Sequence, residues 1–142
     1  MPHAARPAPH PDPSEPSAAS VGTLDAPPDP VRARLLCDLA RLAVDGVAEI
    51  ASGPAAALVG TTPRGLQHRR QAAMYLAHVA FSVRTADVAR GFGRDTTTVY
   101  HAYRQVEDMR DEPTFDAFLD AVENLVTGAA ALAEERGAGA GG

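Results

Sequence analysis

The chain has 142 residues, of which 45% are hydrophobic and only 5% aromatic, and its formal net charge is −5. Such a length favours one domain, and a hydrophobic content made mostly of Ala, Leu and Val predicts an all-α core rather than a sheet. The negative charge argues against a generally basic protein that coats nucleic acid.

The N-terminal stretch is rich in proline, since nine of the twelve prolines lie within residues 1–30. Proline lacks a backbone N–H, and such a composition buries too little apolar surface to offset the entropy of ordering. We predict a disordered Pro/Ala-rich arm over residues 1–29, which serves either as an inert linker or as a segment that docks a partner.

A first helix is predicted from Asp29-Pro30, a capping carboxylate followed by proline, to a stop at Gly53-Pro54. Cys37, the single cysteine, excludes an internal disulfide and is predicted to be a buried small hydrophobe. The apolar positions expected to face the core are Leu35, Leu36, Leu39, Leu42, Ala43, Val47 and Ile50, with the charged residues left for solvent.

After a possible extra turn over residues 55–59, Thr62-Pro63 predicts a second long helix to about Ser82. Its inward residues are expected to be Leu66, Ala73, Leu76, Ala77, Ala80 and Phe81. Basic side chains crowd its first turns, either as a solvated face or as contacts to phosphate: Arg64, His68, Arg69 and Arg70.

A helix, a tight turn and a second helix are predicted between residues 85 and 109. Val88 and Phe92 lie four residues apart on one face of the first helix, and Gly93 can adopt the backbone angles of the turn. Asp95 can cap the next helix. Apolar spacing at Val99, Ala102, Tyr103 and Val106 predicts the buried face of that helix.

A last helix is predicted from Pro113, with helically spaced apolar residues Phe115, Phe118, Leu119, Val122, Leu125 and Val126. Core packing explains that stripe, and pairing with a second copy or another protein is the alternative. From Gly128 onward Ala and Gly dominate, so we expect a helical domain over residues 30–127 and a frayed tail over 128–142.

Positive charge is concentrated in the middle of the chain. Residues 61–104 hold seven arginines against only two acids, Asp87 and Asp95, whereas the segments on either side are acidic. A DNA-binding face needs a local positive field rather than a basic protein, so this distribution is compatible with binding DNA.

Several separated blocks carry a family resemblance: Arg70 to Ala77, Gly91 to Asp95, Thr97 to Val99, and His101-Ala102. In order and spacing they resemble the C-terminal helix-turn-helix DNA-binding domain of the bacterial replication initiator DnaA, over roughly residues 30–127. The resemblance implies a small all-α fold, Trp-repressor-like, that inserts the helix after the glycine turn into the major groove.

By matching position, the resemblance carries over Asp95, Thr97 and Thr98 as base contacts, and Arg94 stands where the family has a backbone-contacting arginine. We expect the residues at the groove to be Arg94, Asp95, Thr96, Thr97 and Thr98. Contacts to the DNA backbone or minor groove are expected from Arg64, His68, Arg69, Arg70, Thr85, Arg90 and Arg104.

This chain departs from the family pattern at three places. Thr96 replaces the histidine of the family's Asp-His-Thr-Thr-Val signature, and a single Gly93 replaces a glycine pair. Of the family's arginine-rich minor-groove loop, Arg64 is the one match. These differences predict binding to sites other than the initiator's own boxes.

The sequence contains no GxxxxGK[ST] phosphate loop, no set of catalytic groups and no familiar zinc spacing, so we expect neither an enzyme nor a cofactor. We predict a cytoplasmic, sequence-specific binder of double-stranded DNA that regulates transcription as an activator. Small proteins resembling this initiator domain include activators of gene transfer agent clusters. The alternatives are replication control at DnaA-box-like sites and a protein-interaction module that does not bind DNA.

A single module of this size buries little surface on DNA, so a helper is expected. Self-association, a DNA-bending protein and RNA polymerase are the candidates, and no membrane contact is predicted because no apolar stretch is long enough to span a bilayer.

Overall fold

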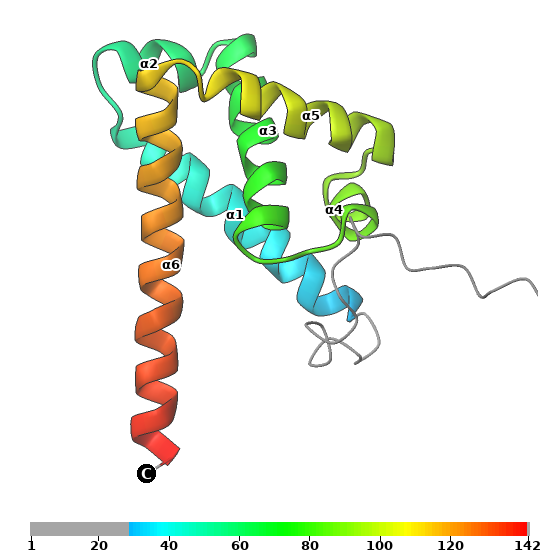
Figure 1. The fold of residues 1–142 in the computed structure, drawn as a ribbon, viewed down its shortest axis with the longest axis vertical. Coiled ribbons are helices and arrows are strands. Elements are labelled where there is room, and N and C mark those ends of the chain that lie inside the picture. Colours follow the sequence, from blue (N-terminus) through cyan, green and yellow to red (C-terminus); the bar gives the residue numbers. More distant parts are fainter. Residues whose placement is uncertain (1–28, 142) are drawn as a thin grey trace, which may run out of the picture.

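The computed structural model describes the backbone of residues 29–141 and the side chains of residues 29–137. Over this range the secondary structure is entirely helical, which confirms the predicted all-α class (Figure 1). The predicted arm lies, apart from Asp29, outside the described residues. The helices are α1 (Pro30–Ile50), α2 (Pro54–Val59), α3 (Pro63–Val79), α4 (Thr85–Phe92), α5 (Thr96–Met109) and α6 (Pro113–Gly141).

Proline marks the first residue of four of these helices, where its missing N–H costs no hydrogen bond. At α1, the Asp29 side chain accepts hydrogen bonds from the backbone N–H groups of Val31 and Arg32. At α3, the Thr62 hydroxyl accepts one from the Gly65 N–H at 3.0 Å. Both predicted cap-plus-proline starts are therefore confirmed.

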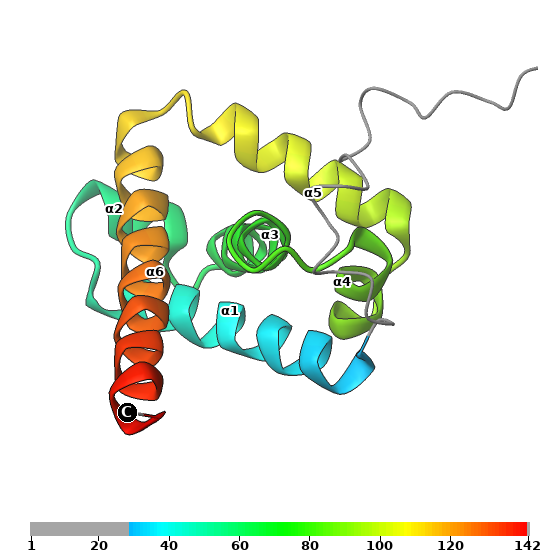
Figure 2. The ribbon, with the colours of Figure 1, turned by 60° about the horizontal axis from the view of Figure 1, so that its bottom comes forward.

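The central helix is α3, with α1 on one side of it and α5 on the other (Figure 2). The short α4 packs against both α1 and α5 and closes one end, while α6 packs against α1 and α2. The core is formed by helices from the whole described chain, and its largest fully buried side chains include Met74, Leu76, Val44, Val88, Val99, Val106, Phe115, Leu119 and Val122.

The predicted buried face of α1 is confirmed for Ala43 and, as partly buried residues packed against the core, for Leu36 and Val47, but it is wrong for the other four large residues. Leu35, Leu39, Leu42 and Ile50 are 62%, 46%, 70% and 81% exposed, and the buried face consists of Cys37, Ala40, Ala43, Val44 and Ala48. Small side chains allow α3 and α4 to approach the α1 backbone closely. The opposite, larger apolar stripe therefore faces solvent.

Cys37 and Gly91 show how close that approach is. A Cβ on Gly91 would lie 2.7 Å from the Cys37 sulfur, so glycine is required where α4 crosses α1. Nearby, the Arg41 guanidinium donates to the Gly91 carbonyl at 2.9 Å and lies over the Phe92 ring at 4.1 Å. Cys37 is fully buried as predicted, and burial raises the pKa of its thiol.

Two further differences from the sequence prediction concern α3 and α6. Leu66 of α3, Ala80 directly after α3, and Leu125 of α6 are exposed rather than inward. Helix α6 also continues beyond Thr127 to Gly141, where we expected a frayed tail. Residues 129–136 contain Ala, Leu, Glu and Arg, all strong helix formers, which explains the extension. Residues 127–137 are all exposed, and the domain boundary at Thr127 stays a prediction.

Candidate nucleic-acid interface

The turn between α4 and α5 is fixed by a left-handed glycine. Gly93 has φ +66° and ψ 36°, and its N–H donates to the carbonyls of Ala89 and Arg90, which end α4. The Arg94 N–H also donates to the Ala89 carbonyl, at 2.9 Å. Glycine adopts this conformation without strain because it has no Cβ. Gly93 therefore ends α4 and forms the predicted turn that leads into α5.

The first turn of α5 is exposed to solvent. Asp95 caps it, accepting a hydrogen bond of 2.7 Å from the Thr98 N–H. This bond is the main reason that the pKa of the Asp95 carboxyl lies below its ordinary value. We call the exposed residues Arg94, Asp95, Thr96, Thr97 and Thr98 the α5 tip.

The opposite face of α5 is fixed against α3 by an aromatic cluster around Tyr103. The His78 ring stacks on Tyr103 with centroids 4.9 Å apart, and Tyr75 and Tyr100 contact it edge-on. The Tyr103 hydroxyl lies 3.4 Å from the hydroxyl of Thr85, which links α5 to the start of α4. Burial raises the pKa of Tyr103. These contacts fix the orientation of α5, and they explain why Thr85 is partly buried rather than fully available to a ligand.

The outer face of α5 extends from the tip along one side of the helix. Thr97, His101 and Arg104 follow the i, i+4, i+7 spacing of one helix face, and all three are exposed. His101 was absent from the sequence-predicted site. The signal that could have found it is its position four residues after Thr97.

Two arginines share the carboxylate of Asp87. Arg90 is a predicted DNA contact, and Arg84 directly precedes α4. Arg90 and Arg84 contact Asp87 at 2.6 Å and 3.0 Å, and Asp87 itself is buried. The guanidinium-bearing side chains of Arg84 and Arg90 remain 59% and 68% exposed. They are oriented by Asp87, which partly neutralises their charge.

Among the predicted DNA contacts, Arg69 is buried and His68 is partly buried. The Arg69 side chain is 7% exposed; its Nε donates to the Val59 carbonyl at 2.7 Å and its Nη1 to Glu49 at 3.1 Å. His68 Nδ1 bonds the Leu58 carbonyl at 2.7 Å. Both side chains fasten α2 to α3, a role that a charge count along the sequence does not reveal.

Four of the predicted contact residues are exposed arginines that form no ion pair within residues 29–137: Arg64, Arg70, Arg94 and Arg104. Arg94 belongs to the α5 tip, and Arg104 to the outer face of α5. Arg64 lies in the first turn of α3.

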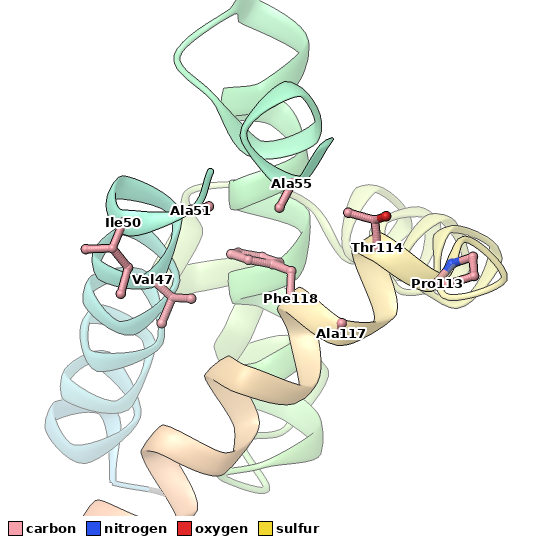
Figure 3. Close-up of a pocket in the computed structure, with 8 residues that line it drawn as sticks. All are labelled: Val47, Ile50, Ala51, Ala55, Pro113, Thr114, Ala117 and Phe118. Carbon is pink, nitrogen blue, oxygen red and sulfur yellow. The ribbon is translucent and has the colours of Figure 1, made fainter. Parts of the chain in front are cut away.

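A shallow apolar groove lies away from this surface, between the C-terminal end of α1, α2 and the start of α6. In Figure 3 the Phe118 ring points between α1 and α2, with Ile50 and Val47 on one side and Ala55 on the other. Among the described residues, it contains none of the predicted DNA contacts.

The fold and site together define a small all-helical domain with an exposed helix-turn-helix. The chain is similar to the chromosomal replication initiator protein DnaA of Caulobacter sp. (strain K31), with 39% identity over 67 residues. The match covers 46% of this chain and 14% of the relative, so the chain spans a small part of that protein's length. No protein-family model matches the chain. No solved structure matches it either.

None of the described helices combines the length and the apolar content needed to cross a lipid bilayer.

Proposed function

We propose that the protein binds double-stranded DNA in a sequence-specific manner through the α5 tip and regulates transcription. The observation that carries the proposal is the run of five exposed residues, Arg94 to Thr98, at the start of a helix that is fixed on its other side. Similarity to DnaA, an initiator of chromosome replication by its name, supports the DNA-binding part of this proposal.

The chemistry of the tip suits the edges of bases. A carboxylate accepts from the cytosine amino group, and a threonine methyl packs against the thymine methyl. Asp95 Oδ1 caps the helix, so we assign base contact to the other carboxylate oxygen. Thr96 and Thr97 supply hydroxyls and methyls, and His101 and Arg104 extend the contact along the groove.

Backbone contacts are assigned to the exposed arginines. Arg94 lies at the tip, Arg90 and Arg84 are presented by Asp87 on α4, and Arg64 and Arg70 lie on α3. We leave out Arg69, which is buried, and His68, which is partly buried and bonds the Leu58 carbonyl, and we propose that Thr85 acts through Tyr103.

Genome-wide mapping of bound sites in living cells, with native protein and with Thr97→Ala, tests the proposal. We expect native protein at discrete promoter sites that share a motif, and Thr97→Ala at the same or weaker sites with one motif position relaxed. A motif identical for both proteins would remove Thr97 from the readout. No enrichment of any DNA would refute DNA binding.

Activation of transcription is the direction that we propose, with a helper such as RNA polymerase or a DNA-bending protein supplying the contacts that one small module lacks. The resemblance to activators of gene transfer agent clusters suggests such clusters as targets. A reporter carrying a mapped promoter should increase its output when the native protein is expressed, but not with Arg94→Ala.

A second candidate is control of replication, favoured by the similarity to a replication initiator. In that case the mapped sites should cluster at the origin and overlap those of the cell's own DnaA. Promoter-centred sites without such overlap would favour regulation of transcription.

A further inference from the structure

The solvent face of α1 carries an apolar stripe that runs the whole length of the helix. Its members recur at intervals of three and four residues, and five of them are large and exposed: Val31 68%, Leu35 62%, Leu39 46%, Leu42 70% and Ile50 81%, with the exposed Gly46 completing the row. The other face of α1 is buried against the domain. A helix that is apolar on both faces is typical of one that has a partner on each.

We propose that this stripe forms an antiparallel pair with α1 of a second copy of the chain. The inference depends on the α1 surface alone and not on DNA binding. In Figure 2, α3 lies between α1 and α5, so the pair would leave both α5 tips accessible.

The row of residues is self-complementary in the antiparallel direction. With the two-fold axis between Leu39 and Leu42, Val31 lies opposite Ile50 of the second copy and Leu39 opposite its Leu42. Leu35 then lies opposite Gly46, where even a Cβ would meet no atom within 4 Å, so the larger side chain enters a vacant position. Large residues face small or matching ones, as in other isologous interfaces.

Charges along one edge of the stripe select the same direction. From N- to C-terminus this edge reads Arg34, Asp38, Arg41, Asp45, Glu49. In the antiparallel pair, Arg34 lies between Asp45 and Glu49 of the second copy, and Asp38 lies beside its Arg41. In a parallel pair this edge would instead face the other edge of the second copy's stripe, which carries Arg32, so these ion pairs would not form. Asp45 and Glu49 bind Arg69 within the chain, yet their side chains remain 57% and 64% exposed and can accept a second cation.

The groove at the C-terminal end of α1 continues this surface. Ile50 belongs both to the stripe and to the groove wall, together with Val47 and Ala51 (Figure 3). The first turn of the second copy's α1, with Val31, would lie beside it. Helix α1 is about 30 Å long, which places such an interface at the small end of specific protein contacts, so the expected dimer is reversible.

Sedimentation equilibrium without DNA tests the pairing. Native protein should move from the monomer mass of 14.8 kDa toward about twice that value as its concentration rises through the micromolar range. Leu39→Glu should remain monomeric at every concentration. The matched control is Leu66→Glu on α3, whose native side chain is also 46% exposed, and it should behave like native protein. Circular dichroism checks that all three proteins are folded.

Variants with one added surface cysteine test the direction of the pair with a short bis-maleimide crosslinker. The native Cys37 is fully buried, so it should not react with the crosslinker. In an antiparallel pair, Val31→Cys alone and Ile50→Cys alone place the two thiols about 28 Å apart and should not crosslink. An equal mixture of the two variants should yield a crosslinked dimer. Crosslinking of Val31→Cys with itself would instead indicate a parallel pair.

A charge variant completes the test. Arg34→Glu should weaken the dimer at least about threefold at low salt, and Arg32→Glu, on the other edge of the stripe, should weaken it less. Native protein that stays at 14.8 kDa throughout, or Leu39→Glu that dimerises like native protein, would overturn the proposal, and the stripe would then be covered by something other than a second copy.

Discussion

The Asp95 carboxylate accepts a hydrogen bond of 2.7 Å from the backbone N–H of Thr98, and this bond begins the helix that we assign to the major groove. The same carboxylate thus has a structural and a proposed recognition role, and substitutions can separate the two. Asparagine caps helices about as well as aspartate, whereas alanine does not.

We therefore expect Asp95→Ala to lower the midpoint of thermal unfolding and Asp95→Asn to leave it nearly unchanged. Both variants should alter the preferred base at the position that Asp95 reads, because both remove the carboxylate. Thermal melts and binding to a pool of random duplexes check the two effects. If Asp95→Asn binds the same DNA sequence motif as native protein, then Asp95 only caps α5 and does not read a base.

The cap should also depend on pH. Because hydrogen bonding lowers the pKa of Asp95 in the folded state, its contribution is fully present above the unfolded pKa of about 3.9 and is lost as the pH falls through the lower folded value. The unfolding midpoints of native protein and Asp95→Ala should thus differ least at the acid end of the range. A difference between them that grows on acidification would contradict this account.

Gly91 and Cys37 pack so closely that a larger side chain at position 91 would collide with the side chain at position 37. Adding a Cβ at Gly91 places it 2.7 Å from the Cys37 sulfur, so Gly91→Ala should destabilise the fold by about 1–3 kcal/mol through overpacking. In a Cys37→Ala background the sulfur is removed but the Cβ of residue 37 still lies 3.0 Å from the added Cβ, so Gly91→Ala should destabilise the fold less than it does in native protein. Urea unfolding of the four proteins measures this coupling, and additive effects would show that the contact is not limiting.

Arg69 and Arg70 are neighbours with different expected roles. Arg69→Ala removes buried hydrogen bonds, including the one to the Val59 carbonyl, and should cost about 1–3 kcal/mol of stability. Arg70→Ala, at an exposed position, should leave stability within about 0.5 kcal/mol but weaken DNA binding. Urea unfolding and fluorescence anisotropy with labelled duplex separate the two. A stable Arg69→Ala protein with reduced DNA affinity would reverse our assignment.

Local sequence signals predicted the helix starts and the turn well. Asp29, Thr62, Gly93 and Asp95 act through backbone groups a few residues away, so the chain itself contains the necessary information. The helix-turn-helix could therefore be placed to within a residue or two.

Long-range packing could not be predicted in the same way. The leucines of α1 were expected inside, but small residues on its other face allow α4 to approach through Gly91, a contact between positions 37 and 91 that no local pattern reveals. Arg69 was misassigned for the same reason, because its partners come from α1 and α2. His101, in contrast, lies four residues after Thr97 and could have been placed on the same helix face from the sequence.

The most direct test of the central claim is the salt dependence of duplex binding by native protein, Arg94→Ala and Arg136→Ala. Arg136 is an exposed control on the end of α6, far along the chain from the tip. If some five phosphates are neutralised, the log-log slope for native protein and Arg136→Ala should be about −4. Arg94→Ala should bind more weakly, with a slope shallower by about 0.9. Equal slopes and affinities for all three proteins, or no binding by any, would contradict recognition of DNA by the α5 tip.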